Sequence, residues 1–207
     1  FLPNNRWDFG YVPKGGSVSH TFQVKNIGED TLVIVKVRPG CACTMVPLLK
    51  DRLAPDETAD LEVIFDSKKI RKGKTSKSIQ IISNDPTKPF QDLHFTVRVG
   101  ETNSLVKIIP EEIRFDTIHQ VKGAEQSITL ENISEEELSL ELVDAPEDLV
   151  DLNIKKSSLK PGEKTEIILR LKKDAPQGSF RSSFTVDFEN SKMVRVTVPV
   201  HGVVATN

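Results

Sequence analysis

Two cysteines separated by one residue are the sharpest chemical feature of this sequence. Cys41 and Cys43 are the only cysteines among 207 residues. Two thiolates are soft ligands for zinc or copper, although a closed metal site usually needs further ligands. A disulfide between them would close a very small, strained ring that is easily reduced. As small, adaptable side chains, the pair can also simply cap the edge of a β-sheet.

The surroundings of the pair favour the structural interpretation. The C-x-C spacing differs from the C-x-x-C at a helix N-terminus that lowers a thiolate's pKa in thioredoxin-like proteins. No second cysteine pair exists. The strand patterns place His20 on a buried face and His94 on a polar one, so neither is expected to point at the cysteine loop. We therefore expect no bound cofactor, and we keep a metal or redox site at Cys41 and Cys43 as the alternative.

Catalytic motifs are missing from the sequence. A nucleophile and base would have to draw on four histidines, and no G-x-S-x-G or H-E-x-x-H string is present. His119 falls in a predicted turn and His201 near the C-terminus, where we expect solvated side chains. The sequence therefore predicts a protein that is not an enzyme.

Charged clusters point to solvated turns. Calcium prefers six to eight converging oxygens, often from a D-x-D-x-D-G loop, and Asp56, Asp66 and Asp85 do not form one. Glu135-Glu136-Glu137 is predicted to be a turn between strands. Lys68 to Lys74 contains five basic residues and is predicted to be the charged tip of a hairpin, with an anionic-ligand site as the alternative.

Bulk charge and hydropathy exclude several partners. The formal net charge is −2, so nothing in the overall charge attracts phosphate backbones or anionic lipid. We expect no nucleic acid partner. No apolar run approaches the roughly 20 residues of a membrane helix, so we also expect no membrane span. The first five residues lack the basic and apolar regions of a signal peptide, so the chain is either cytosolic or has lost a leader.

The elements that position these residues belong to an internal sequence repeat with two copies. Asn26-Ile27 recurs as Asn132-Ile133, an offset of 106. Trp7-Asp8 and Phe115-Asp116 begin the two copies, and aligning these pairs with the offset of 106 requires a gap of two residues. Six further pairs keep the same offset: Leu32 and Leu138, Leu53 and Leu159, Pro55 and Pro161, Glu57 and Glu163, Leu61 and Ile167, Asn84 and Asn190.

Hydrophobic residues alternate with a period of two in both copies, which is typical of strands with one buried face. Residues 18–25, 59–65 and 93–99 follow this pattern in the first copy. Residues 184–188 and 194–200 follow it in the second, and no stretch carries a sustained helical stripe. The inward phase predicts six core residues: Phe22, Val63, Phe95, Leu130, Leu169 and Phe188.

Turn residues divide the chain into two domains of about 100 residues, the size of an immunoglobulin-type sandwich. The polar stretch Gly100 to Ser104 lies between two strand patterns. The fold class is therefore all-β, with two tandem immunoglobulin-like β-sandwich domains at residues 1–102 and 103–207. Because the boundary is short, we expect the domains to sit end to end with restricted hinge motion.

Short motifs follow one another through the first hundred residues: Trp7-Asp8-Phe9-Gly10, His20-x-Phe22-x-Val24-x-Asn26-x-Gly28, Leu32-x-Ile34-x-x-Val37, Cys41-Ala42-Cys43-Thr44, Pro55-x-Glu57 and Phe65-Asp66. Together they resemble a bacterial envelope family of unknown function, common in the Bacteroidetes. That family is similar in architecture to hydin-type and major-sperm-protein immunoglobulin folds. The second half resembles it through Asn132, Leu138, Pro161 and Glu163 but has no cysteine pair.

The resemblance implies a secreted or lipid-anchored, mostly structural protein, and it transfers no catalytic residue. We therefore expect a periplasmic, outer-membrane-associated or extracellular location, with room for a lipid anchor upstream of residue 1. The favoured function is a non-catalytic binding, assembly or spacer protein whose partner is a protein. The alternatives are a metal or redox accessory protein acting through Cys41 and Cys43, and a carbohydrate-associated envelope protein, which would need more exposed aromatics than one Trp and one Tyr.

Overall fold

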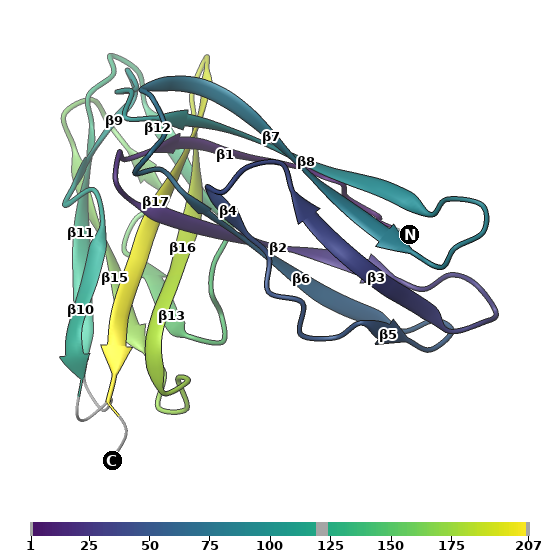
Figure 1. Ribbon diagram of the computed structural model, residues 1–207. Helices are drawn as coiled ribbons and strands as arrows, with labels where there is room; N and C mark the ends of the chain where they lie inside the picture. Colours follow the sequence, from purple (N-terminus) through teal and green to yellow (C-terminus); the bar gives the residue numbers. More distant parts are fainter. Residues whose placement is uncertain (1, 119–123, 206–207) are drawn as a thin grey trace.

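The computed structural model describes residues 2–118 and 124–205, and it consists of strands and their connections (Figure 1). His119 and the turn predicted around it lie outside the described residues. The first sandwich has eight strands: β1 Arg6–Val12, β2 Ser17–Lys25, β3 Leu32–Pro39, β4 Thr44–Met45, β5 Arg52–Leu53, β6 Thr58–Asp66, β7 Gly73–Ser83 and β8 Phe90–Val99.

The second sandwich repeats these strands after one additional strand, β9. Its strands are β9 Val106–Ile109, β10 Ile113–Ile118, β11 Glu125–Asn132, β12 Leu138–Asp144, β13 Val150–Ile154, β14 Ser158–Leu159, β15 Lys164–Leu171, β16 Gly178–Glu189 and β17 Met193–Val204.

Each copy packs two sheets against each other, with strand orders typical of an immunoglobulin-like sandwich. In the first copy, β2-β6-β4 faces β1-β8-β7-β3-β5. In the second, β13-β15-β11-β9 faces β14-β12-β16-β17, with β10 alongside β17. The opening strand of each copy pairs in parallel with its last strand, β1 with β8 and β10 with β17. The predicted fold class is confirmed.

Two separate hydrophobic cores fill the sandwiches. One is built from buried residues between Leu2 and Val99, and the other from buried residues between Leu105 and Val204. The six predicted core residues are all at most 2% exposed, so the strand registers read from the alternation are confirmed. We keep the boundary between residues 102 and 103 as our proposal for separating the two domains.

The repeated asparagine explains part of the sequence offset. Asn26 is buried, and its side-chain Nδ2 donates to the main-chain oxygens of Asp30 and Leu53 at 2.8 and 3.0 Å. Asn132 makes the same pair of bonds, to Glu136 and Leu159. Each side chain thus ties an exposed turn after one strand to a short strand of the opposite sheet, and the buried amide finds its partners within the protein.

The two sandwiches meet at an angle (Figure 1), so the expected end-to-end arrangement is wrong. β1 pairs with β17 through Tyr11 and Val196, which joins one sheet of each domain into a continuous sheet. Gly10 makes this close approach feasible: its φ is +64°, and a Cβ there would overlap the main-chain carbonyl of Arg195.

The predicted hairpin at the basic stretch is also wrong in detail. The basic stretch Lys68 to Lys74 links β6 to β7, and these strands belong to opposite sheets. Ile70 in its middle packs against the first core, so the segment is anchored rather than a free tip. The prediction for Glu135-Glu136-Glu137 is confirmed: it is an exposed turn between two strands, β11 and β12, which belong to opposite sheets.

Candidate functional site

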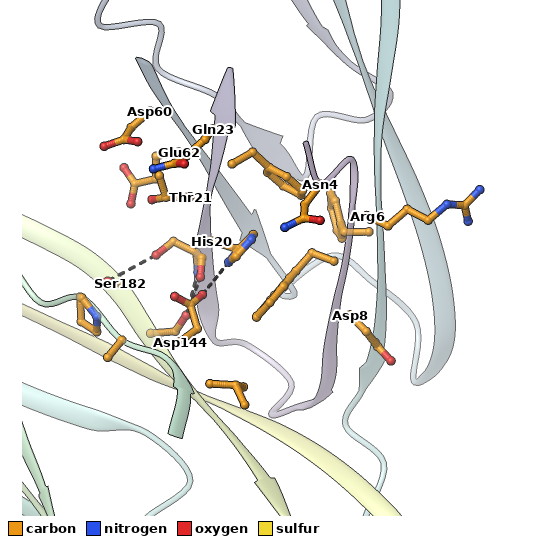
Figure 2. Close-up of a pocket in the computed structure, with 18 of the residues that line it drawn as sticks. Asn4, Arg6, Asp8, His20, Thr21, Gln23, Asp60, Glu62, Asp144 and Ser182 are labelled. Atoms are coloured by element: carbon orange, nitrogen blue, oxygen red, sulfur yellow. Dashed lines mark hydrogen bonds and ion pairs between the residues drawn. The ribbon is translucent and has the colours of Figure 1, made fainter. Parts of the chain in front are cut away.

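A cleft of about 1510 Å³ lies where the two sandwiches meet. The first domain contributes residues of β1, β2, β6, β7 and β8, and the second contributes the end of β12 with the connection to β13, together with β16 and β17. In Figure 2, β2 runs through the middle of the site. The cavity exceeds the usual 300–1000 Å³ of a small-molecule site, so it has room for part of a larger molecule.

His20 of β2 crosses the domain boundary at the floor of this cleft. Its Nδ1 lies 2.6 Å from Oδ2 of Asp144, the last residue of β12 (Figure 2). Trp7 stacks on the His20 ring with centroids 3.6 Å apart and planes 4° from parallel. The prediction that His20 lies on a buried face is therefore confirmed only in part: its side chain follows the inward phase of β2 but is half-buried.

Arg195 of β17 holds Trp7 from the second domain. Its guanidinium carbon lies 4.9 Å from the centre of the Trp7 ring, a cation–π distance. The guanidinium donates two hydrogen bonds to the Asp187 carboxylate, at 2.6 and 2.7 Å, and these bonds fix it and raise its pKa, so Arg195 stays charged. A third bond reaches the main-chain oxygen of Asp8 at 3.3 Å. These contacts fix the relative position of the two domains.

A second connection joins β2 to β16. The Ser19 main-chain N–H donates to Oγ of Ser183 at 2.9 Å, and the same hydroxyl donates to the main-chain oxygen of Ser19 at 2.9 Å. Both serines are buried. Ser183 thus satisfies both main-chain groups of one residue on β2, which acts as a clamp across the domain boundary.

The histidine and aspartate invite comparison with a hydrolytic triad, which also needs a nucleophile on the second ring nitrogen. Ser19 and Ser182 lie nearby, with their hydroxyls 3.3 Å apart. Among the described residues, no hydroxyl forms a hydrogen bond with His20. The geometry therefore suits His20 and Asp144 to holding the domains together.

Acidic side chains gather on the other flank of β2. Asp60 and Glu62 of β6 lie beside Thr21 and Gln23 (Figure 2). Burial raises the pKa of Glu62; a hydrogen bond with the Ser19 side chain opposes this rise, and the charge of Asp148 in the second domain adds to it. Carboxylates from both domains therefore approach each other on this side of the cleft.

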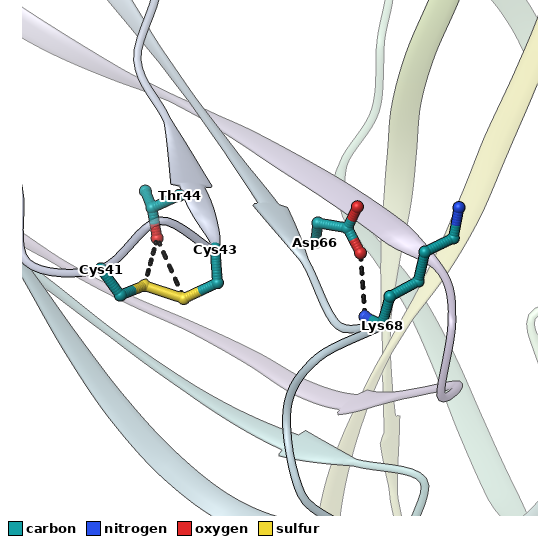
Figure 3. The surroundings of a disulfide bond; sticks show 5 residues. All are labelled: Cys41, Cys43, Thr44, Asp66 and Lys68. Atoms are coloured by element: carbon teal, nitrogen blue, oxygen red, sulfur yellow. Dashed lines mark hydrogen bonds between the residues drawn. A yellow bond between two sulfur atoms is a disulfide. The ribbon is translucent and has the colours of Figure 1, made fainter.

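Cys41 and Cys43 form a disulfide beside the beginning of β4 (Figure 3). Thr44 Oγ1 lies 3.4 and 3.9 Å from the two sulfurs. Metals bind thiolates, so the metal interpretation applies only to the reduced pair. The described residues contain no group of three or more His, Cys, Asp or Glu side chains arranged to hold a metal ion. The metal and redox roles of the pair stay predictions.

The second domain uses the corresponding connection differently. In place of the cysteine loop it carries Asp144 to Asp148, and this segment lines the cleft against the first domain. Asp144 supplies the partner of His20. The two copies thus differ at this connection in two ways: the first carries the cysteine pair, and the second carries a segment that contacts the other domain.

The other histidines are placed as follows. His94 lines the cleft from β8, on the polar phase of its strand as predicted. His201 lies in β17 and is half-buried, so the expectation of a solvated side chain is wrong. Burial lowers the pKa of His201, and the positive charges of Arg114, Arg181 and Lys68 add to that effect while Glu112 opposes it.

Sequence reasoning missed Asp144 and Arg195 as site residues. Asp144 was visible only as part of the stretch that replaces the cysteine loop, and Arg195 only as a polar residue within an alternating strand. Both act on partners in the other domain, and the spacing of residues in one domain carries no signal for such a contact.

Fold and site together define a tandem immunoglobulin-like protein with an interdomain cleft. The family described as "Protein of unknown function (DUF1573)" matches residues 2–99 and again 106–204, and the chain belongs to this family. The resemblance noted in the sequence is thereby confirmed. No curated protein matches the chain in sequence.

Several solved structures are similar over most of the chain or over one domain. A protein of unknown function from Porphyromonas gingivalis W83 is 13% identical with a TM-score of 0.39, covering 98% of both chains. The CupB2 chaperone of Pseudomonas aeruginosa is 13% identical with a TM-score of 0.38, covering 96% of this chain and 98% of its own. A PapD-like domain of human CEP192 is 9% identical with a TM-score of 0.39, covering 50% and 86%.

Among the described residues, no helix has the length and apolar character needed to cross a bilayer.

Proposed function

We propose that this chain is a non-catalytic binding protein of the cell envelope, and that it holds a protein partner in the cleft between its two domains. The observation that carries the proposal is the cleft itself, which both domains line and which the contacts of His20, Asp144 and Arg195 keep open at one fixed angle. A preorganised concave site of this size lowers the entropy cost of binding.

The disulfide supports the proposed location in the cell envelope. Disulfides persist mainly in oxidising compartments such as the periplasm and the cell surface. The Cys41–Cys43 pair therefore favours a periplasmic, outer-membrane-associated or extracellular protein, for which a lipid anchor upstream of residue 1 is one means of attachment.

A carbohydrate partner is less well supported. Sugar-binding sites present aromatic faces, and this chain has one Trp and one Tyr. Trp7 contacts His20 and Arg195, while the Arg98 guanidinium lies over the Tyr11 ring at 5.6 Å. Both rings are thus engaged within the protein.

Site-specific photo-crosslinking tests the proposal. A photoreactive phenylalanine replaces Thr21 in the cleft or, as a control, the exposed turn residue Glu29, in cells that naturally make the protein. We expect a discrete protein adduct from position 21 and none from position 29. Equal adducts from both positions, or none from position 21, would overturn the proposal.

A further inference from the structure

The open edge of β2 is the most informative feature of the cleft. β2 pairs with β6 over nine consecutive residues without a bulge and is the outer strand of the sheet β2-β6-β4. The N–H of Asn26 donates to the Glu57 oxygen, and the N–H of Ser67 donates to the Gly16 oxygen. Even-numbered residues of this strand therefore face β6, and odd-numbered residues turn their main-chain groups outward.

Two of the outward positions lack partners. Ser19, the first outward residue in the cleft, is satisfied by Ser183 of the second domain. At the next two, Thr21 and Gln23, no main-chain hydrogen bond exists to any described residue, and both residues are exposed. Both also line the cleft. The edge is thus covered where the second domain touches it and open immediately beyond.

Exposed edges in native proteins are usually protected by proline, a charge or a bulge. Residues 21–24 of β2 are Thr, Gln, Phe and Val, and the register is unbroken, so these devices are missing from this stretch. The next outward residue, Lys25, carries a charge and forms an ion pair with Asp56, which limits the open stretch to Thr21 and Gln23. The second domain lines the other side of the cleft and so limits the access of other sheets to this edge (Figure 2). A short open stretch of edge inside a cleft fits a site that accepts a partner strand.

Charge selects the partner. Asp60 and Glu62 follow the open edge on β6, and Glu147 and Asp148 face the same cleft from the second domain. None of these four carboxylates forms an ion pair with a described residue. Because neighbouring carboxylates repel one another, a cationic side chain placed among them is favoured.

We propose that the edge of β2 at Thr21 and Gln23 binds an extended, lysine- or arginine-bearing segment of the partner protein as an added antiparallel or parallel strand. This inference rests on the proposed function and specifies how the cleft holds its partner. Side chains opposite Thr21 and Gln23 would share the sheet face of Glu62 and Asp60, because cross-strand neighbours point to the same side. Main-chain bonds supply affinity, and the acidic row supplies selectivity.

The probe is a blocked nine-residue peptide of alternating threonine and lysine, added to ¹⁵N-labelled protein. Hydrogen exchange gives the first readout: in the free protein the amides of Thr21 and Gln23 should exchange faster than those of Phe22 and Val24. Saturating peptide should slow exchange at Thr21 and Gln23 by about tenfold or more, since each gains a hydrogen-bond partner. Electrostatic attachment without strand addition would leave both rates unchanged.

Matched variants separate main chain from side chain. Gln23→Pro removes an outward N–H without breaking a bond to β6, whereas Gln23→Ala keeps that N–H. We expect Gln23→Pro to weaken the peptide about fivefold to tenfold and Gln23→Ala to leave binding nearly unchanged. A fully N-methylated peptide tests the main-chain bonds in the unaltered protein, so this test holds even if Gln23→Pro disturbs β2. We expect this peptide not to bind.

Charge is tested by a peptide with glutamate in place of lysine, which should bind at least about tenfold more weakly. Equal binding of the two peptides, equal effects of the two Gln23 variants, or no protection of Thr21 and Gln23 at millimolar peptide would overturn this inference. A crosslinked partner at position 21 together with any of these results would leave the proposed function standing. Loss of the crosslink would remove both.

Discussion

Replacing the buried Asn26 with alanine tests the connection that the sequence repeat encodes. Three protein hydrogen bonds end on this side chain: Nδ2 donates to Asp30 and Leu53, and Oδ1 accepts from the Gly28 N–H at 3.0 Å. Each such bond contributes about 1 kcal/mol net to the free energy of unfolding. Their sum sets an expected loss near 3 kcal/mol.

Burial of the partners adjusts this value. Gly28 and Asp30 are exposed, so water can replace the amide at those two groups. Leu53 is fully buried, and although its carbonyl stays paired with the Leu32 N–H in the ladder of β3 and β5, water cannot replace the lost amide there. We therefore expect Asn26→Ala to lower the free energy of unfolding by about 2–3 kcal/mol, a large part of the 5–15 kcal/mol typical of a domain.

Urea unfolding followed by tryptophan fluorescence measures this loss in the first domain, because Trp7 is the only tryptophan in the chain. Asn84→Ala is the matched control. Asn84 also bonds two main-chain groups, the Val33 N–H and the Thr31 oxygen, but it is exposed. The control should lose less than about 1 kcal/mol. An Asn26→Ala loss no larger than that of the control would refute the reasoning.

Three further predictions concern titration and the disulfide. Glu62→Gln should raise Tm at pH 7, because burial lifts the Glu62 pKa above its unfolded value of 4.5. The wild-type protein should regain stability relative to the variant as the pH falls toward 4.5 and Glu62 becomes protonated. A Tm difference that does not change with pH would contradict this prediction. The pKa of His201 is lowered, so wild type should lose stability as pH falls through 6.5, and His201→Gln should flatten that loss; parallel melting curves from pH 7 to 5 would disprove it. Replacing Cys41 and Cys43 with serine should cost only about 1–2 kcal/mol because the closed loop is so short, and a measured loss above about 3 kcal/mol would show a structural role.

Alternation and a constant offset were enough to predict both sandwiches and their cores. Phe22 and Phe188 could be assigned inward because a strand's side chains alternate, which is a local property of the chain. The spacing of Asn26 and Asn132 likewise repeats because each makes its bonds within its own domain. The sequence by itself therefore determined the fold class, the duplication and the inward residues.

Only the tertiary structure decided the angle between the domains and the cleft that results. His20 and Asp144 are 124 residues apart, and Trp7 meets Arg195 from the far end of the chain. These contacts depend on β1 joining β17 and on Ser183 clamping the edge of β2. Each is a hydrogen bond or charge contact between surfaces that belong to different repeats. Periodicity within one repeat reports which side chains face its own core, and it carries no information about which of the remaining side chains meet across a boundary.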